Sequence, residues 1–380
     1  MNHPIYLDYN ATTPVASEVA EAILSCVTEA YGNPSSSYPL GRQACAIVDG
    51  ARRSVAELIG ADADELYFTG CATEANNLAL LGVARALGSA KRHLVVSAIE
   101  HPAIMEPAQQ LKREGWSLTV VPVDHYGRVS VADVEASMRP DTALASIMHA
   151  NNEIGTIQPI REISEIMRRK GVLLHTDAAQ SVGKIPVDVQ TLGVDLLTLA
   201  GHKFHATKGI GALYVRRGTP ITNILFGAGQ ERGLRPGTEN VPAIAGLGAA
   251  SRLARERLPS VEARLGAMRD ALHERLHASI PGLQLNGDSN DRLPNTLNLS
   301  FPAVSGRALV QAVSDHVAAS VGSACHSEAD AVSGVLAAIG CDGARAASAV
   351  RLSTGWPTTV DEIERAADAL VTAWRQLARP

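Results

Sequence analysis

The sequence has few cysteines, and no two of them have the spacing of a paired-cysteine motif. Its five cysteines are scattered over 380 residues and include no Cys-x-x-Cys pair. This distribution argues against a disulfide framework and against a structural zinc site. We therefore expect free thiols, as in a reducing compartment, and no bound metal. The cysteines are Cys26, Cys45, Cys71, Cys325 and Cys341.

Long apolar runs and an excess of positive charge are also absent. No apolar segment approaches the ~20 residues that span a bilayer, and the first residues contain no basic region followed by an apolar one. The 34 basic residues stand against 39 acidic ones, and the two signs alternate along the chain. We therefore predict a cytoplasmic protein that neither enters a membrane nor binds nucleic acid directly.

Lysine is scarce, because arginine carries most of the positive charge. Chemistry that needs a primary amine therefore has few candidate residues. The lysines are Lys91, Lys112, Lys170, Lys184, Lys203 and Lys208.

The sequence does contain the pattern of an α/β fold. From about residue 15 to 260, short apolar runs alternate with stretches of helical period, such as 161–170. This alternation predicts a mostly parallel central sheet covered by helices on both faces. Ligands of such sheets bind at the carboxyl ends of the strands. The expected strands are 65–69, 93–97, 117–121, 144–148, 172–176 and 195–199.

The pattern changes after about residue 260. A helix is expected over 261–280, a strand over 295–301 and a closing helix from Thr359. We predict a large domain formed by 15–260. A smaller α+β domain would combine 261–380 with 1–14 and would carry Cys325.

Two predicted strands end in groups suited to a pyridine cofactor. Lys203 follows the strand 195–199 and a small Ala-Gly pair, where a partly desolvated amine can lose its proton and form a Schiff base. Asp177 ends another strand, and a buried carboxylate there could keep the ring nitrogen of pyridoxal 5′-phosphate (PLP) protonated. Gln180 could donate to the ring oxygen. Taken singly, Lys203 also fits a surface lysine and Asp177 a helix N-cap.

Two further strand ends complete this pattern. Small residues after Phe68 open a helix over 70–77, whose N–H groups and dipole suit a phosphate. The spacing of a P-loop or dinucleotide fingerprint is lacking, so a single phosphate is favoured over ATP or NAD. His101 follows another strand. Its imidazole could stack on a pyridine ring and move a proton, or could equally satisfy local backbone groups.

Cys325 differs from the other cysteines in its surroundings. It lies among glycine, serines and alanine in the segment 320–327. Such a segment suits a thiol that must travel to a substrate. Cys26 and Cys341 better fit the usual small buried hydrophobic side chain.

Together these segments resemble the NifS/IscS-like cysteine desulfurases, which belong to the PLP-dependent class-V aminotransferases of fold type I. The resemblance covers nearly the whole chain, and its motifs occur in the same order. They lie at 6–14, 32–36, 72–74, 100–101, 151–155, 175–181, 201–203, 235–238, 322–325 and 351–353.

The resemblance implies a role for each matching position. Lys203 would bind PLP, Asp177 would pair with its ring nitrogen, and Gln180 would contact its ring oxygen. His101 would stack on the ring and take part in proton transfer. The phosphate ligands would be Ala72, Thr73, His202 and, across a homodimer interface, Thr238. Asn152 would contact cofactor and substrate, and Arg351 and Asn33 the substrate, with the Arg351 guanidinium suited to its carboxylate.

The implied reaction converts L-cysteine to L-alanine. Cys325, as thiolate, would attack the substrate sulfur and carry it as a persulfide to an acceptor protein. That acceptor could be an iron–sulfur scaffold, a tRNA-thiolation protein or a DNA-phosphorothioation protein. The sequence departs from the family pattern at Ala200, where many relatives have serine, and at Cys71, where glycine is usual. It also has His-Ala-Thr at 205–207 in place of Tyr-Gly-Pro.

Three other functions stay open from the sequence. A selenocysteine lyase would share the stretch 229–240 and the Cys-His-Ser at 325–327. An aminotransferase of the same fold would need a 2-oxo acid acceptor and has no use for Cys325. A binding protein without PLP would be colourless.

Overall fold

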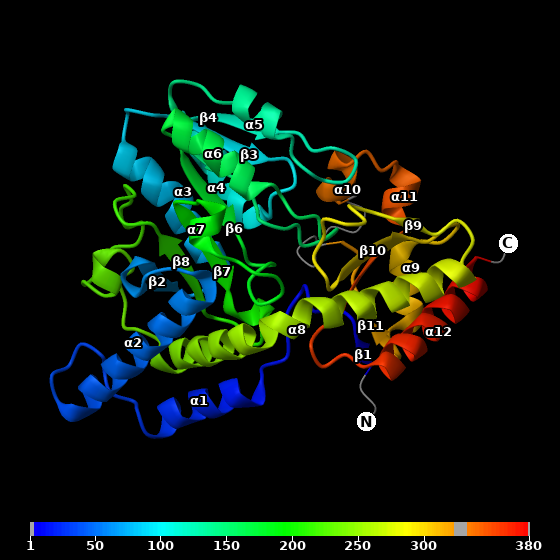
Figure 1. The fold of residues 1–380 in the computed structure, drawn as a ribbon, viewed down its shortest axis with the longest axis horizontal. Helices are drawn as coiled ribbons and strands as arrows, with labels where there is room; N and C mark the ends of the chain where they lie inside the picture. The colour runs from blue at the N-terminus through cyan, green and yellow to red at the C-terminus, as the bar shows by residue number, and fades with distance from the viewer. Residues whose placement is uncertain (1–3, 323–332, 379–380) are drawn as a thin grey trace.

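The computed structural model describes residues 4–322 and 333–378. They form a large lobe and a smaller lobe, joined along one side by a single long helix (Figure 1). Within the described residues, the large lobe holds a seven-stranded sheet in the order β2-β8-β7-β6-β5-β3-β4. Its strands are β2 (Leu66–Thr69), β3 (His93–Ser97), β4 (Ser117–Val121), β5 (Thr142–Ser146), β6 (Leu173–Asp177), β7 (Leu196–Ala200) and β8 (Gly211–Val215).

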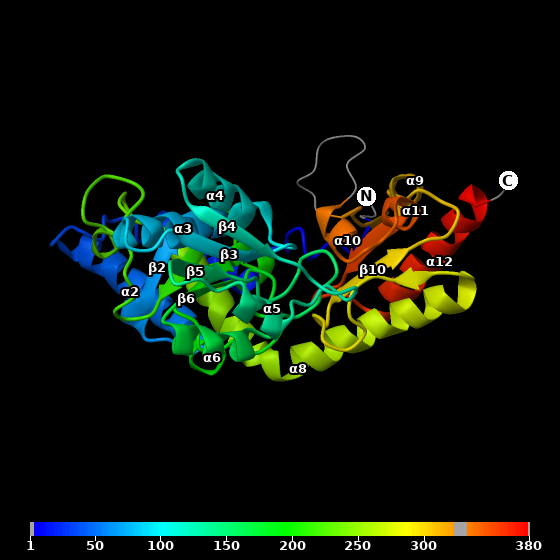
Figure 2. The same cartoon turned by 90° about the horizontal axis from the view of Figure 1, so that it is seen from above.

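The sheet is mostly parallel, as predicted. Strand β8 is the exception, since it pairs antiparallel with both β2 and β7. Every residue of β3, β5, β7 and β8 is buried, which is the state of a sheet covered on both faces. Figure 2 shows α3 (Ala72–Leu87) and α4 (Pro102–Arg113) on one face and α6 (Ile160–Lys170) on the other.

The helices bury apolar stripes against this sheet. In α6, Ile160, Ile163, Ile166 and Met167 are buried, and their spacing follows the helical period. Gly171 ends this helix in the left-handed conformation (φ 62°), where a side chain would be strained. Short helices α5 (Val131–Ala136) and α7 (Val189–Leu192) complete the crossovers.

All six expected strands exist, with small differences at their ends. The largest difference concerns β5, which was expected over 144–148 and lies at Thr142–Ser146. Its apolar run continues through Met148, but the Met148 N–H donates to the Glu100 side chain and not to a neighbouring strand. Strand β8 was not among the expected strands.

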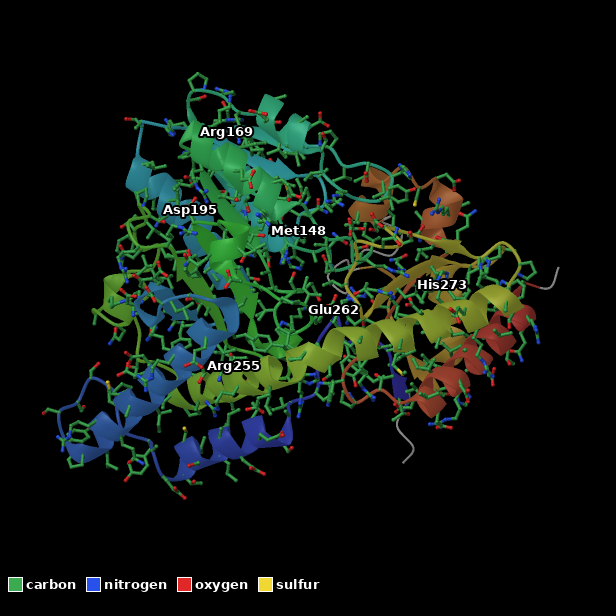
Figure 3. The ribbon with its side chains drawn as sticks, in the orientation of Figure 1. Met148, Arg169, Asp195, Arg255, Glu262 and His273 are labelled. Atoms are coloured by element: carbon green, nitrogen blue, oxygen red, sulfur yellow. The ribbon has the colours of Figure 1, made fainter. Side chains whose placement is uncertain are left out.

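The predicted start of the long helix at residue 261 is wrong. Helix α8 runs from Val241 to Ser279, and the Asn240 side chain caps it by accepting the Ala243 N–H. Pro259 lies inside this helix, and a proline in the sequence ordinarily predicts that a helix is interrupted there. The helix packs on α1 (Ser17–Thr28) and α2 (Pro39–Ile59) at one end and on α12 (Val360–Leu377) at the other. Figure 3 labels Arg255, Glu262 and His273 along its course from the large to the small lobe.

The small lobe contains an antiparallel sheet in the order β12-β10-β9. Strand β1 pairs with β11, so the N-terminal segment lies in this lobe, and Ile5 and Leu7 join the core cluster of Leu297, Phe301 and Leu370. The predicted boundary at residue 260 falls inside α8, and the division into domains stays a prediction. The remaining elements are β1 (Ile5–Tyr6), β9 (Gln284–Leu285), β10 (Thr296–Ser300), α9 (Gly306–Val313), β11 (Val317–Ala318), α10 (Gly334–Ala338), α11 (Gly343–Ala347) and β12 (Ala349–Ser353).

The closing helix begins where the sequence predicts. Thr359 caps α12, and its side chain and that of Glu362 form a capping box. None of the described helices is both long enough and apolar enough to cross a bilayer.

Candidate active site

A cavity of about 250 Å³ lies at the carboxyl ends of β6 and β7, where a sheet of this kind binds its ligands. It is walled by the large lobe, the N-terminal segment at Asn10 and Ala11, and Arg351 of β12. Met148, labelled in Figure 3, also lines it. The predicted residues that line it are Ala72, Thr73, His101, Asn152, Asp177, Gln180, His202, Lys203 and Arg351.

Lys203 lies in the short 3₁₀ turn Gly201–Lys203 that follows β7. Its Nζ donates to the backbone oxygens of Asn10, at 2.6 Å, and Ala11, at 2.8 Å. The turn is tight at Gly201, where an added Cβ would lie 2.8 Å from the Ile210 side chain. The fold thus brings the amine against a segment nearly two hundred residues away in the sequence.

Asp177 is held rigidly at the end of β6. Its Oδ1 accepts the Ala179 N–H at 2.9 Å, and its Oδ2 accepts Asn76 Nδ2 of α3 at 2.7 Å. The side chain is buried and still lines the cavity. The segment that follows is a turn and not a helix, so the interpretation of Asp177 as a helix N-cap is wrong; the carboxylate holds this turn and lines the cavity.

The N-terminus of α3 opens into the same cavity. Cys71, at the N-cap, makes no side-chain capping hydrogen bond, and Cys71, Ala72 and Thr73 line the cavity wall. The first N–H groups of a helix are therefore available for an anion. An uncapped helix N-terminus, a buried carboxylate and a lysine in one cavity are the set of groups that PLP requires, so these residues fit that cofactor.

Two histidines at the cavity have fixed orientations. His101 caps α4, and its Nδ1 accepts the Ala103 N–H at 3.1 Å, so the neutral ring carries its proton on Nε2. His202 Nδ1 lies 3.2 Å from Thr12 Oγ1. Burial, and after it the charges of nearby lysines, lower the pKa of His202 to about 4, so this ring is neutral at physiological pH.

Arg351 is the most deeply buried charge at the cavity, with its side chain 2% exposed. One terminal nitrogen donates to Asp8 Oδ1 at 2.7 Å, and the other donates to the Asn152 backbone oxygen at 3.1 Å. Its Nε has no hydrogen-bond partner among the described residues. A buried donor of this kind is suited to an anionic ligand.

Several residues of the site were missed from the sequence. Asn10 donates to Thr296 and to the Asn152 backbone, Asn76 holds Asp177, and Asp8 pairs with Arg351. Asn10 and Asp8 lie in the motif at 6–14, which was the available signal. Nothing in the sequence pointed to Lys184, which donates to Gln180.

Two predicted site residues that the structure describes do not line this cavity. Thr238 lines a neighbouring pocket with Arg235 and Glu239. Asn33 lies exposed in the loop between α1 and α2, where its Oδ1 accepts the Ser35 N–H at 2.9 Å. Cys325 lies outside the described residues.

The fold and this cavity define a class of protein. Residues 5–366 match the family model described as aminotransferase class-V. The chain therefore belongs to the class-V aminotransferase family.

Within that family, its relatives are cysteine desulfurases. The chain is 43% identical to the cysteine desulfurase IscS of Dictyoglomus turgidum over 97% of its own length and 94% of the relative's. Among solved structures, a NifS-like protein shares 36% identity with a TM-score of 0.92, covering 99% of both chains. A structure of SspA in complex with cysteine shares 35% identity with a TM-score of 0.82, covering 92% of this chain and 98% of that one. The predicted fold type and the resemblance to NifS/IscS-like enzymes are confirmed.

Proposed function

We propose that this protein is a PLP-dependent cysteine desulfurase that converts L-cysteine to L-alanine and passes the sulfur to Cys325. The proposal depends on one observation, which is that Lys203, Asp177 and Arg351 line the same cavity. The names of the relatives support it, as does the cysteine complex of SspA. Selenocysteine lyase and aminotransferase are the less favoured alternatives.

Different residues of the cavity bind different parts of the cofactor in this proposal. PLP, when bound, supplies an electron sink for the bonds at the substrate α-carbon. Lys203 binds it covalently, Asp177 holds its ring nitrogen protonated, and Gln180 donates to its ring oxygen. Ala72 and Thr73 offer N–H groups at the start of α3, and His202 adds a neutral ring to the phosphate site.

The substrate is oriented by Arg351 and Asn152. The Nε of Arg351 is the buried donor left for a carboxylate, while Asp8 holds the other side of the guanidinium. Lys203 and His101 move protons at the substrate, with His101 presenting Nε2–H because its Nδ1 is occupied by the backbone.

Cys325 completes the reaction as the sulfur acceptor. Its thiolate attacks the substrate sulfur, an S–S bond forms as the C–S bond breaks, and the carbon takes up a proton to leave as alanine. The product is a persulfide on Cys325. The small residues on either side of Cys325 in the sequence support this role.

The assembly we propose is a cytoplasmic homodimer that hands sulfur to a separate protein. Thr238 then reaches the phosphate of the partner subunit's site, which accounts for its place outside the cavity of its own chain. The acceptor is an iron–sulfur scaffold, a tRNA-thiolation protein or a DNA-phosphorothioation protein. Capture of proteins labelled by radioactive sulfur from Cys325 distinguishes these three.

The test combines two variants with labelled cysteine. The wild-type protein should show an absorption band near ~420 nm that borohydride abolishes, and Lys203→Ala should lack it. Cys325→Ser should keep the band, lose cysteine turnover and retain no labelled sulfur on the protein. Intact cysteine turnover in Cys325→Ser would contradict the desulfurase mechanism and favour a lyase. Turnover that requires a 2-oxo acid would favour an aminotransferase.

A further inference from the structure

Lys184 is a buried lysine that the proposed mechanism does not use. It lies in the turn that follows β6, and its residue is 5% exposed. Gly183 before it adopts a φ of +79°, and an added Cβ there would lie 2.7 Å from the Phe204 side chain. The backbone therefore directs Lys184 into the protein, behind the cavity and not toward solvent.

The Lys184 amine contacts two side-chain amides that line the cavity. Its Nζ donates to Gln180 Oε1 at 2.8 Å and to Asn10 Oδ1 at 3.0 Å. Because the Lys184 amine donates both hydrogen bonds, both amides turn their oxygens toward it. Lys184 therefore orients the Gln180 amide, and it shares the orientation of the Asn10 amide with Asn295, whose Nδ2 donates to the same Asn10 Oδ1 at 3.0 Å.

The consequence reaches Lys203 through Asn10. With its oxygen held by Lys184, Gln180 donates through Nε2 to the Asn10 backbone oxygen at 3.0 Å. The same backbone oxygen accepts Lys203 Nζ at 2.6 Å. The Asn10 side chain, oriented in the same way, donates to Thr296 Oγ1 of the small lobe at 2.8 Å. Lys184 thus lies at the centre of a network that joins the amine, the Gln180 amide and both lobes.

The surroundings of Lys184 are unusual for a lysine. Its two acceptors are neutral amide oxygens. Burial lowers its pKa well below the ordinary value, and the charges of Lys203 and Arg351 lower it further. Burying an amine with only neutral acceptors lowers the free energy of unfolding. The presence of Lys184 here therefore indicates that it has a function at the active site. The titratable and charged groups that face it are Lys203, Arg351, His202 and His205.

We infer that Lys184 is a positioning residue that orients the Asn10 and Gln180 amides and so presents the Gln180 N–H donor and the Lys203 amine to the cofactor. This inference rests on the proposed role of Lys203 as the PLP lysine. It assigns Lys184 a role in the proposed function, although Lys184 lies behind the reacting groups and does not contact the substrate.

A second, smaller cavity makes a conservative test possible. It measures about 40 Å³ and is lined by Lys184, Lys203, His205 and Thr354 among others. Thr354 Oγ1 is buried without a partner in the described part of the chain. This space adjoins residue 184, so arginine, which is longer and keeps hydrogen-bond donors at its end, is the conservative replacement.

The experiment is a pH titration of the visible absorption band of the holoenzyme. A donor on the cofactor ring oxygen favours the deprotonated form of the nitrogen bonded to Lys203. Lys184→Met no longer holds the Gln180 amide in the orientation that presents this donor, so the midpoint of the titration should rise by about one pH unit. Lys184→Arg should stay within about 0.3 unit of the wild type, because it keeps donors toward both amide oxygens. Lys112→Met, on the exposed end of α4, is the matched control and should not move the midpoint.

Each outcome separates the inference from the proposed function. An unchanged midpoint in Lys184→Met with cofactor bound would overturn the inference alone, whereas a wild-type protein without the band would overturn the proposed function. If Lys184→Met does not fold, Lys184→Gln keeps a polar group in the buried position and should also raise the midpoint. In a Gln180→Leu background, adding Lys184→Met should not raise the midpoint further, because the amide that Lys184 orients is already gone.

Discussion

At the scale of the single residue, burial decides charge states that the sequence cannot show. Glu100 follows β3 and is 8% exposed. Its Oε1 accepts one hydrogen bond from Ser97 Oγ at 2.5 Å and one from the Met148 N–H at 2.8 Å. Its Oε2 has no partner within residues 4–322 and 333–378. Burial raises the pKa of Glu100 to about 8, and the nearby Asp177 adds to this. The side chain is therefore a neutral acid at physiological pH.

Glu100 makes the stability of the protein depend on pH. The folded state keeps a proton that the unfolded state releases above the ordinary pKa of 4.5, so the free energy of unfolding falls as pH rises from 4.5 to about 8. Glu100→Gln keeps the size and shape of the side chain but does not titrate. Between about pH 5 and pH 8, we expect the free energy of unfolding of the wild type to fall by roughly 3 to 4 kcal/mol relative to this variant in urea denaturation. Glu114→Gln, on the surface, is the control, and parallel pH profiles for wild type and Glu100→Gln would refute the prediction.

Ala200 gives a second prediction at this scale. It is 1% exposed, ends β7 and lines the cavity, but it has no side-chain donor for a phosphate. We expect Ala200→Ser to bind PLP about fivefold to tenfold more tightly, since one added hydrogen bond contributes about 1 kcal/mol. The measurement is the dissociation constant for PLP with the apoprotein. A dissociation constant that stays the same or increases would show that the hydroxyl does not reach the cofactor.

At the scale of secondary-structure elements, one buried ion pair ties a loop to a helix. Arg52 of α2 binds Glu231 through two hydrogen bonds of 2.8 and 2.6 Å, and Glu231 also accepts the Phe68 N–H at 2.9 Å. The exposed fractions of the two side chains are 10% and 3%. The loop has positive φ angles at Glu231 and Arg232, so these contacts stabilise a backbone that would otherwise be strained.

We expect Glu231→Ala to destabilise the protein by about 3 kcal/mol, because it leaves the Arg52 charge buried and unpaired. The double variant Arg52→Met with Glu231→Leu should lose much less, because it buries no charge. The midpoints of chemical denaturation measure both. Equal losses in the single and double variants would mean that packing, and not the charge pair, stabilises this loop.

At the scale of the whole molecule, Thr238 is the residue through which the proposed homodimer can be tested. The described chain leaves it in a pocket beside the cavity, with Arg235, which pairs with Glu74 of α3 at 2.8 Å. A homodimer in which Thr238 serves the partner subunit's phosphate site explains that arrangement. It also makes each active site depend on two chains.

Mixed dimers test this dependence. Lys203→Ala and Thr238→Ala are each expected to be impaired as pure dimers. When they are mixed, a heterodimer contains one site with both changes and one site with neither, so up to half of the wild-type turnover per heterodimer should return. If Thr238 serves its own chain, no intact site forms and mixing restores nothing. Light scattering on the same samples establishes whether dimers are present.

The sequence by itself was sufficient for the class of fold and for the order of the motifs. The buried strands of such a sheet have continuous apolar runs, so β3, β6 and β7 could be located to within about one residue. The more exposed edge strand β4 could be located equally well. Lys203 and Asp177 directly follow or end such runs. Their convergence at one edge of the sheet then follows from the parallel arrangement.

Other features depended on contacts between distant segments, which no local pattern records. Helix α8 crosses Pro259 because its two halves are held by different lobes, against the local signal for a break. The pairing of Asp8 with Arg351 and the burial of Lys184 behind Lys203 join segments hundreds or tens of residues apart. The sequence determined which chemical groups stand at the strand ends, because that is local. The tertiary structure alone decided which of them share a hydrogen bond or lose their solvent, because hydration and partners are set only once the chain has closed on itself.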